Sequence, residues 1–314
     1  MHFKVGSRSS SLALKQTNTV INELKKINSD FTFEIVNITS SGDINQHSTI
    51  SGIGVEGVFV KELEEALVDH QVDFVVHSLK DMPTLIHSQC EIMSVLKRTE
   101  VRDVLVSKNN INFTNLPAGS SVGTSSIRRV CQLKSMRNNL NYQNIRGNLP
   151  TRLKKLEDGQ YDAIILAAAG LERLGLSHKI CQYFDVFELT PPAGQGTLAV
   201  ECLISNDKIA EILKYIDDST VRAQITAERS FLAKLGGGCS YPIGATAWVD
   251  DDHKLNLLGC VASLDGSSVI RHTLSHEFNN SREAQEKLGE TLALHLINNG
   301  ALKLLSQDVK SISN

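Results

Sequence analysis

The chain has 314 residues, of which 41% are hydrophobic and 21% charged, with a formal net charge of -3 at pH 7. This length allows two or three compact domains, and the near-neutral charge argues against a general nucleic-acid-binding protein. The N-terminus lacks the apolar core of a signal peptide, and no run of about 18 apolar residues occurs, so we expect a cytoplasmic protein without a membrane partner.

The first part of the chain alternates predicted strands and helices. Apolar runs at residues 2–7 (HFKVGS), 31–39 and 72–78 (VDFVVHS) are typical of strands, and helices are predicted after Ser9 or Ser10 and over residues 61–70. This βαβ order predicts an α/β domain with a mainly parallel sheet. We assign it residues 1–97, with residues 197–216 returning to it as a strand and a helix.

A second α/β series begins after the apolar signal lapses around residues 97–103. Strands are predicted at DVLVS, SSVGTSS, NYQNIRG and YDAIILAAAG, each followed by a helix or a turn, which gives a second α/β domain at residues 102–191. The remaining residues, 219–314, predict a long helix, short strands with a hairpin turn at Asp265-Gly266, and a final helix. We therefore expect an α+β C-terminal domain with a small antiparallel sheet.

The sequence VVHSLKDMPT carries the first candidate site. A buried strand ends at His77 and places Ser78, Lys80 and Asp81 in the loop at its carboxyl end, the edge where open parallel sheets bind ligands. An ordinary solvated turn before Pro83 is the simpler interpretation. A carboxylate among cations can also stabilise a transient cation or transfer a proton, which is the role we predict for Asp81.

Three strand-to-helix junctions place arginines beside a helix start. GTSSIRR contains Arg128 and Arg129, IRGNLPTR contains Arg146 and Arg152, and GSRSSS contains Arg8. Helix N-termini offer unpaired N–H groups, and guanidiniums bind carboxylates or phosphates in bidentate fashion. Each arginine alone is most simply a solvated surface residue. Their repetition predicts a ligand with several negative charges, held between the two α/β domains.

Other sites are not supported by the sequence. There is no Walker A sequence, and GIGVEG at 52–57 has its glycines in the wrong frame for a dinucleotide fingerprint. His77, Asp81 and Ser125 lack the G-x-S-x-G elbow of a hydrolase. The histidines are dispersed and the six cysteines form no Cys-x-x-Cys pair, so we expect no metal site and free thiols in a reducing compartment.

Eight stretches of the sequence together resemble one known family. They are VGSRSSSLAL, FVKELE, HSLKDMPT, GTSSIRR, RGNLPTRL, LAAAGLERLG, PPAGQGTLAVE and GGGCSYPIG. Their order is that of the porphobilinogen deaminases, also called hydroxymethylbilane synthases. The resemblance covers nearly the whole chain and implies two periplasmic-binding-protein-like α/β domains, the C-terminal α+β domain and a monomeric enzyme.

The resemblance also implies an activity and a cofactor. A dipyrromethane cofactor would be thioether-linked to Cys239, the cysteine of the glycine-rich loop AKLGGGCSYPIG. The enzyme would join four porphobilinogens head to tail on that cofactor, with loss of ammonia at each step, and water would release hydroxymethylbilane. Asp81 would stabilise the azafulvenium cation left by ammonia and deliver a proton to the leaving amine.

Two sets of binding residues follow from the same resemblance. Beside Cys239, the residues expected to hold the cofactor are Ser78, Lys80, Asp81, Thr124, Ser125, Ser126, Arg128 and Arg129. Those expected to bind the substrate or the lengthening chain are Arg8, Ser10, Arg146, Arg152, Arg173 and Gln195.

The sequence departs from the family pattern at three places. Gly54-Val55-Glu56-Gly57 stands where Gly-Gly-Lys-Gly is usual, which reverses a charge on an expected lid. Tyr241 replaces a small aliphatic residue, and Ser11 replaces a frequent proline or lysine.

Two other functions compete with this interpretation. A non-catalytic anion-binding protein on the same two-lobed scaffold explains the arginines, but it leaves Asp81 and the third domain without a role. An enzyme with Cys239 as nucleophile needs a general base, for which His77 and His253 are the candidates.

Overall fold

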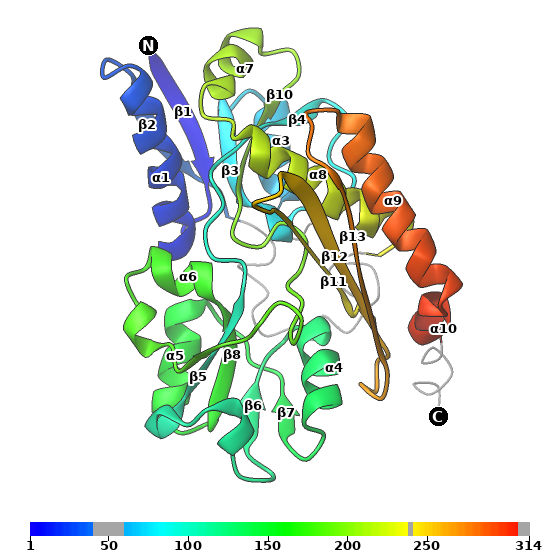
Figure 1. The fold of residues 1–314 in the computed structure, drawn as a ribbon. Coiled ribbons are helices and arrows are strands. Elements are labelled where there is room, and N and C mark those ends of the chain that lie inside the picture. Colours follow the sequence, from blue (N-terminus) through cyan, green and yellow to red (C-terminus); the bar gives the residue numbers. More distant parts are fainter. Residues whose placement is uncertain (40–59, 238–240, 307–314) are drawn as a thin grey trace. The chain divides into compact units, whose positions relative to one another are not determined.

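The computed structural model describes residues 1–39, 60–237 and 241–306 (Figure 1). The chain forms two compact units, with residues 1–99 and 196–222 in unit 1 and residues 100–195 and 223–314 in unit 2. The expected lid sequence at 54–57 and the expected cofactor cysteine, Cys239, lie outside the described residues.

Unit 1 contains a five-stranded sheet in the order β2-β1-β3-β10-β4. Strands β1, β2 and β3 run parallel, and β10 pairs antiparallel with both β3 and β4. Four strands therefore share one direction and β10 alone is reversed. The strands are β1 (His2–Ser7), β2 (Thr32–Asn37), β3 (Phe74–Ser78), β4 (Cys90–Val95) and β10 (Leu198–Leu203), and the helices are α1 (Ser11–Ile27), α3 (Lys61–Val68) and α7 (Asp207–Lys214).

The core of unit 1 follows from the spacing of its apolar residues. Val20, Ile21 and Leu24 line one face of α1 and pack with Phe3 and Phe74 of the sheet. All six residues of β10 are buried, as expected for a strand covered by helices on both faces. This packing fixes the carboxyl ends of β1 and β3 at one edge.

Unit 2 contains a second five-stranded sheet in the order β7-β6-β8-β5-β9, in which β5 alone is reversed. The two sheets thus share one spatial arrangement of strand directions. The reversed strand comes last along the chain in unit 1 but first in unit 2. The elements are β5 (Asp103–Ser107), β6 (Ser121–Gly123), β7 (Asn141–Gln143), β8 (Ala163–Ala167), β9 (Gln182–Tyr183), α4 (Ile127–Met136), α5 (Leu149–Glu157) and α6 (Ala168–Arg173).

The C-terminal part of unit 2 is an antiparallel sheet in the order β11-β12-β13, packed against helices (Figure 1). A Cβ atom built at Gly289 would lie 2.4 Å from the Ala227 carbonyl oxygen, so glycine is required for the close approach of α9 to α8. The elements are β11 (Ile243–Val249), β12 (Lys254–Ala262), β13 (Val269–Glu277), α8 (Ser219–Lys234), α9 (Arg282–Asn298) and α10 (Ala301–Ser306).

The fold class expected from the sequence is confirmed. Two mainly parallel sheets and a smaller antiparallel sheet are present, and β10 lies in the sheet of unit 1 with α7 in the same unit. Strands β4 and β9 and the reversed direction of β5 and β10 were not predicted. In the described part of the chain no helix is both long and apolar enough to span a membrane.

Candidate active site

The edge of the sheet in unit 1 brings together two of the predicted loops. Val5 of β1 pairs in parallel with Phe74 of β3, so both strands end at the same edge, at Ser7 and Ser78. Gln16 of α1 donates from Nε2 to the Ser78 hydroxyl, at 2.7 Å. The loops that carry Arg8 and Asp81 are therefore neighbours at this edge.

Buried residues on either side of Asp81 hold its loop in place. Leu79 and Met82 are buried, and the Leu79 N–H donates to the Thr197 carbonyl at 3.1 Å. The short 3-10 helix Leu79–Asp81 leaves Asp81 itself exposed and Lys80 half-buried. The structure thus displays the predicted catalytic carboxylate on a fixed turn.

The edge of the sheet in unit 2 collects the other predicted loops. Strands β6, β7 and β8 are parallel, so Thr124, Ser125 and Ser126 follow β6 at the edge where the loop with Arg146 follows β7. The Ser125 hydroxyl contacts the Asn144 side-chain oxygen at 2.5 Å and the Ile145 carbonyl. These contacts join the two loops.

The helix starts at the three arginine-bearing junctions differ in their caps. Ser10 accepts a hydrogen bond from the Ala13 N–H at the start of α1, and Asn148 accepts one from the Thr151 N–H at the start of α5. Ser126 at the start of α4 makes no such bond. Its first turn therefore keeps N–H donors that no capping side chain occupies, as an anion site requires.

Arg128 and Arg129 are buried rather than solvated, with 4% and 7% of their surface exposed. Arg128 donates to the Thr190 carbonyl and to Asp103 Oδ2, both at 2.6 Å. Arg129 donates to the Ile165 carbonyl at 3.1 Å and to Asp103 Oδ1 at 2.6 Å. The Nε atom of Arg129 is buried and has no hydrogen-bond partner among the described residues.

Asp103 is a functional candidate that the sequence analysis missed. Burial alone would raise the pKa of this wholly buried carboxyl group, but the charges of Arg128 and Arg129 outweigh burial and hold it well below its usual range. The sequence did contain a signal for this role, because Asp103 is the first residue of the apolar strand DVLVS. A carboxylate buried in such a strand needs a partner that satisfies its charge.

Gln195 lies in the same cluster and is wholly buried. Its side-chain amide donates to the Val101 carbonyl at 2.6 Å and to Asp103 Oδ1 at 3.0 Å. The structure thus unites three of the predicted binding residues, Arg128, Arg129 and Gln195, around one unpredicted carboxylate.

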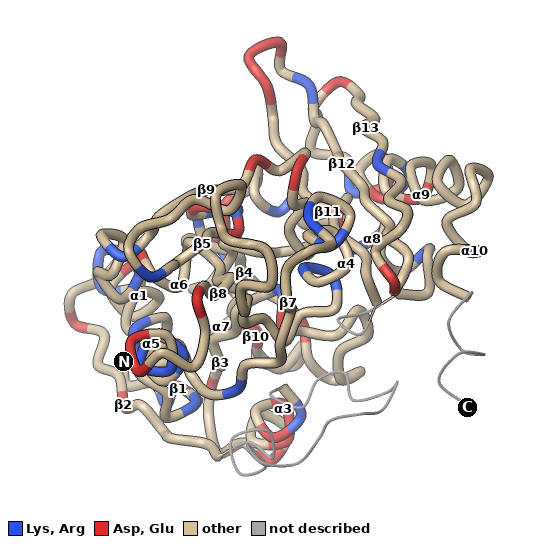
Figure 2. Tube along the Cα trace, turned by 90° about the horizontal axis from the view of Figure 1, so that it is seen from below, with Lys and Arg blue, Asp and Glu red and all other residues tan. Residues whose placement is uncertain are grey.

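The other predicted arginines are half-buried. Arg152 on α5 donates from Nε to the Gly147 carbonyl at 2.8 Å, and Lys155 donates to the Arg146 carbonyl at 3.1 Å. These bonds tie α5, whose Lys and Arg residues are blue in Figure 2, to the preceding loop. Arg173 ends α6, and burial lowers its pKa to about 10. Among residues 1–39, 60–237 and 241–306, no cluster of three His, Cys, Asp or Glu side chains could hold a metal ion.

Arginine-bearing loops at the carboxyl edges of α/β sheets are typical of proteins that bind anionic ligands. The family described as "Porphobilinogen deaminase, dipyromethane cofactor binding domain" matches residues 3–211, and "Porphobilinogen deaminase, C-terminal domain" matches residues 223–298. The chain belongs to the porphobilinogen deaminase family. It is an enzyme of tetrapyrrole biosynthesis that acts on porphobilinogen and uses a dipyrromethane cofactor.

Two porphobilinogen deaminases are similar to the chain over most of its length and agree with this assignment. The chain is 45% identical to a porphobilinogen deaminase of Brevibacillus brevis over 86% of this chain and 88% of that protein. It is 40% identical to one of Halalkalibacterium halodurans, over 99% of this chain and 98% of that protein. Among solved structures, the methionine binding protein MetQ is 15% identical, with a TM-score of 0.43 over 68% of this chain and 88% of that one.

Proposed function

We propose that the loops at the carboxyl edges of the two α/β sheets carry out the family's reaction in this protein, with Asp81 as the catalytic carboxylate and Cys239 as the point of cofactor attachment. The reaction joins four porphobilinogens head to tail, releases ammonia at each step and yields hydroxymethylbilane. Each porphobilinogen carries an acetate and a propionate group. The growing product therefore accumulates carboxylates, which the cationic loops are suited to bind.

The residues of α4 fit the acidic side chains of dipyrromethane. The unpaired Nε of Arg129 and the first turn of α4, which lacks a side-chain cap, both offer N–H donors to an anionic oxygen. We assign to the cofactor the residues Ser78, Lys80, Asp81, Thr124, Ser125, Ser126, Arg128, Arg129 and Cys239. When bound, dipyrromethane supplies the primer to which the first substrate is joined.

Asp81 has the features of a residue that acts on substrate. It is exposed at the carboxyl end of β3, on a turn fixed by the buried Leu79 and Met82. We propose that its protonated carboxyl group gives the proton to the leaving amine and that the resulting carboxylate stabilises the cation formed when ammonia leaves porphobilinogen.

We propose that six further residues bind the substrate and the lengthening chain. Four are the half-buried arginines Arg8, Arg146, Arg152 and Arg173. Ser10 already accepts a hydrogen bond at the start of α1, so its hydroxyl hydrogen is the group left to donate. Gln195 contributes through the cluster around Asp103.

We also propose that the chain has three domains, at residues 1–97 with 197–216, 102–191 and 219–314. The three separate sheets support this division. We propose a cytoplasmic monomer without a nucleic-acid or membrane partner. The cytoplasmic assignment is supported by the cysteines of the described residues, Cys90, Cys131, Cys181, Cys202 and Cys260, which are all free thiols.

The main observation that supports this proposal is the unpaired, buried Nε of Arg129. The proposal is tested by the intact mass of the purified protein. We expect an adduct of dipyrromethane mass and a pink to violet colour with acidic aldehyde reagent. Cys239→Ser should lose both. Cys181→Ser, which changes a half-buried free thiol, should keep both.

Two results would contradict the assignment. An unmodified wild-type chain with full activity would show that the enzyme needs no covalent cofactor. An adduct that persists in Cys239→Ser would show that Cys239 is not the attachment point. An active protein that carries no adduct and is inactivated by Cys239→Ser would instead support Cys239 as the nucleophile.

A further inference from the structure

Asp103 opens β5 and accepts hydrogen bonds from three side chains that reach it from two other segments. We propose that Asp103 is a positioning residue for cofactor binding, because it fixes the two guanidiniums of α4 and sets the charge they present. The inference rests on the proposed function, since it takes Arg128 and Arg129 as cofactor-binding residues.

The geometry divides the carboxylate between the two arginines. Asp103 Oδ2 accepts from Arg128, while Oδ1 accepts from Arg129, both at 2.6 Å, and Oδ1 also accepts from Gln195 at 3.0 Å. Charge-assisted bonds of this length define the orientation of a planar guanidinium more strictly than a neutral contact does. Neither arginine contacts another carboxylate among the described residues.

The charge of Asp103 is needed because the two arginines are adjacent and buried. Two guanidiniums side by side repel each other, and burial weakens the screening that water would supply. One carboxylate offsets one of the two positive charges. The pair therefore presents a single net positive charge, which matches one carboxylate of a bound ligand.

A second set of contacts holds α4 through Gln132, which lies one helical turn after Arg128. Gln132 accepts from the Thr190 N–H at 2.9 Å and donates to the Thr190 carbonyl at 3.1 Å, and Arg128 donates to that same carbonyl. Arg271 of β13 donates to the Gln132 side-chain oxygen at 2.8 Å. With α4 held in this way, the orientation of the two guanidinium groups depends on the Asp103 carboxylate.

Arg129 shows what this orientation achieves. Asp103 and the Ile165 carbonyl occupy its two terminal nitrogens, and its Nε hydrogen is left buried and unpaired among the described residues. A buried donor without a partner is costly, and an anionic oxygen of the cofactor would satisfy it. If Asp103 were lost, the guanidinium would be free to turn and the donor would no longer be fixed.

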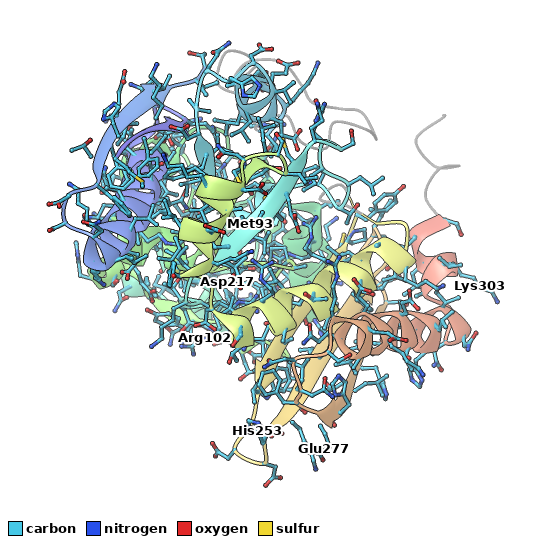
Figure 3. All side chains as sticks on the ribbon, turned by 90° about the horizontal axis from the view of Figure 1, so that it is seen from above. Met93, Arg102, Asp217, His253, Glu277 and Lys303 are labelled. Atoms are coloured by element: carbon cyan, nitrogen blue, oxygen red, sulfur yellow. The ribbon has the colours of Figure 1, made fainter. Side chains whose placement is uncertain are left out.

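The test compares Asp103→Asn with Asp217→Asn in the full-length enzyme. Asp217, which is labelled in Figure 3, is a control in unit 1, since it accepts from Arg222 Nε and Nη2 at 2.7 Å each and forms no hydrogen bond with a proposed ligand residue among those described. For each variant we would measure the melting temperature, the fraction of chains that carry the adduct, and kcat and KM of the loaded fraction.

We expect Asp103→Asn to lower the loaded fraction by about tenfold or more and to raise KM more than it lowers kcat. Asp217→Asn should lower the melting temperature while leaving loading and KM close to wild type. Equal loading and KM in Asp103→Asn and wild type would overturn the inference. Wild-type protein without any adduct would instead refute the proposed function.

Asp103→Glu keeps the test decisive if the asparagine variant does not fold. It retains the negative charge but moves the carboxylate by one methylene, so the protein should fold with its arginines displaced. We expect loading between that of the wild type and that of Asp103→Asn, with a raised KM. Wild-type loading and KM in this variant would show that the position of the carboxylate is unimportant, and would refute the positioning role.

Discussion

His77 on β3 and Glu201 on β10 form a buried pair, with 2.9 Å between Nε2 and Oε2 and side-chain exposures of 4% and 0%. The other carboxylate oxygen of Glu201, Oε1, is buried without a hydrogen-bond partner among the described residues. Among those residues, His77 is therefore the only side chain that hydrogen-bonds to Glu201. The pair joins the neighbouring strands β3 and β10 one residue before Ser78. It therefore supports the turn that displays Asp81.

We expect His77→Ala to destabilise the protein strongly, by about 3–5 kcal/mol, because it leaves the Glu201 carboxylate buried and unpaired. Glu201→Gln should cost less, since the amide retains hydrogen-bonding capacity towards His77 and carries no charge. Urea unfolding of unit 1, followed by circular dichroism, measures both. A loss below about 1 kcal/mol for His77→Ala would show that water or a rearrangement satisfies Glu201.

Asp81→Asn is expected to separate binding from chemistry. The amide keeps the size of the side chain but cannot stabilise a cation by charge or deliver the proton, so kcat should fall by a factor of about 10² to 10⁴. The adduct should remain, because the arginines and Cys239 are unchanged. Steady-state kinetics and intact mass give the two readings.

Asp69→Asn is the matched control, because Asp69 is an exposed carboxylate at the end of α3 in the same unit. Its kcat should equal that of the wild type. Near-normal turnover in Asp81→Asn would show that Asp81 is not the catalytic residue.

Thiol alkylation should distinguish the cysteines by burial. Burial raises the pKa of Cys90 and of Cys202 to about 12, so neither forms the reactive thiolate near pH 8. Cys181 is half-buried and should react first in the folded holoenzyme. Cys239 should not react, because the proposed thioether to the cofactor would occupy its sulfur.

Peptide mapping after alkylation would locate the label. Modification of Cys239 in adduct-bearing protein would contradict the thioether. Rapid modification of Cys90 or Cys202 would show that the core of unit 1 opens readily.

Glu64 is expected to make stability depend on pH. Burial, the largest cause, raises its pKa and the charge of Glu201 adds to this, while the hydrogen bond from the His87 N–H opposes it. A carboxyl group whose pKa is higher in the folded state binds more protons when folded, so its contribution is favourable at low pH and is lost as pH rises through that pKa.

Glu64→Gln should therefore raise the melting temperature at pH 7, by about 1–2 °C, and have little effect near pH 4. The amide oxygen can still accept from the His87 N–H. Scanning calorimetry at the two pH values measures the difference. A lower melting temperature at pH 7 would show that the charge of Glu64 is stabilising.

Local patterns in the sequence predicted much of the fold. The apolar run at residues 2–7 is β1 and the Ser10 cap starts α1, because short-range sterics and one side-chain bond decide both. β4 was missed because its exposed Glu91 and buried Ser94 break the apolar signal. Its partner β10 lies more than 100 residues later, and no local pattern records that pairing or its direction.

The site was predicted in its residue types but not in its internal contacts. The helix start beside Arg128 and Arg129 indicates anion binding, since dipoles and donors belong to the local chain. Their pairing with Asp103 depends on how β5 is placed in the sheet. That placement is a tertiary property, so the carboxylate that fixes both arginines could not be read from the motif.

The position of β10 between β3 and β4 has a consequence for synthesis. Its residue Glu201 follows His77 by 124 residues, which a ribosome adds in about 6–25 s. During that time β3 and β4 have unpaired edges, whereas β5 to β9 are continuous in the chain and complete their own sheet first. The nascent chain therefore carries an open sheet edge for seconds, and a ribosome stalled before residue 198 would leave an aggregation-prone product.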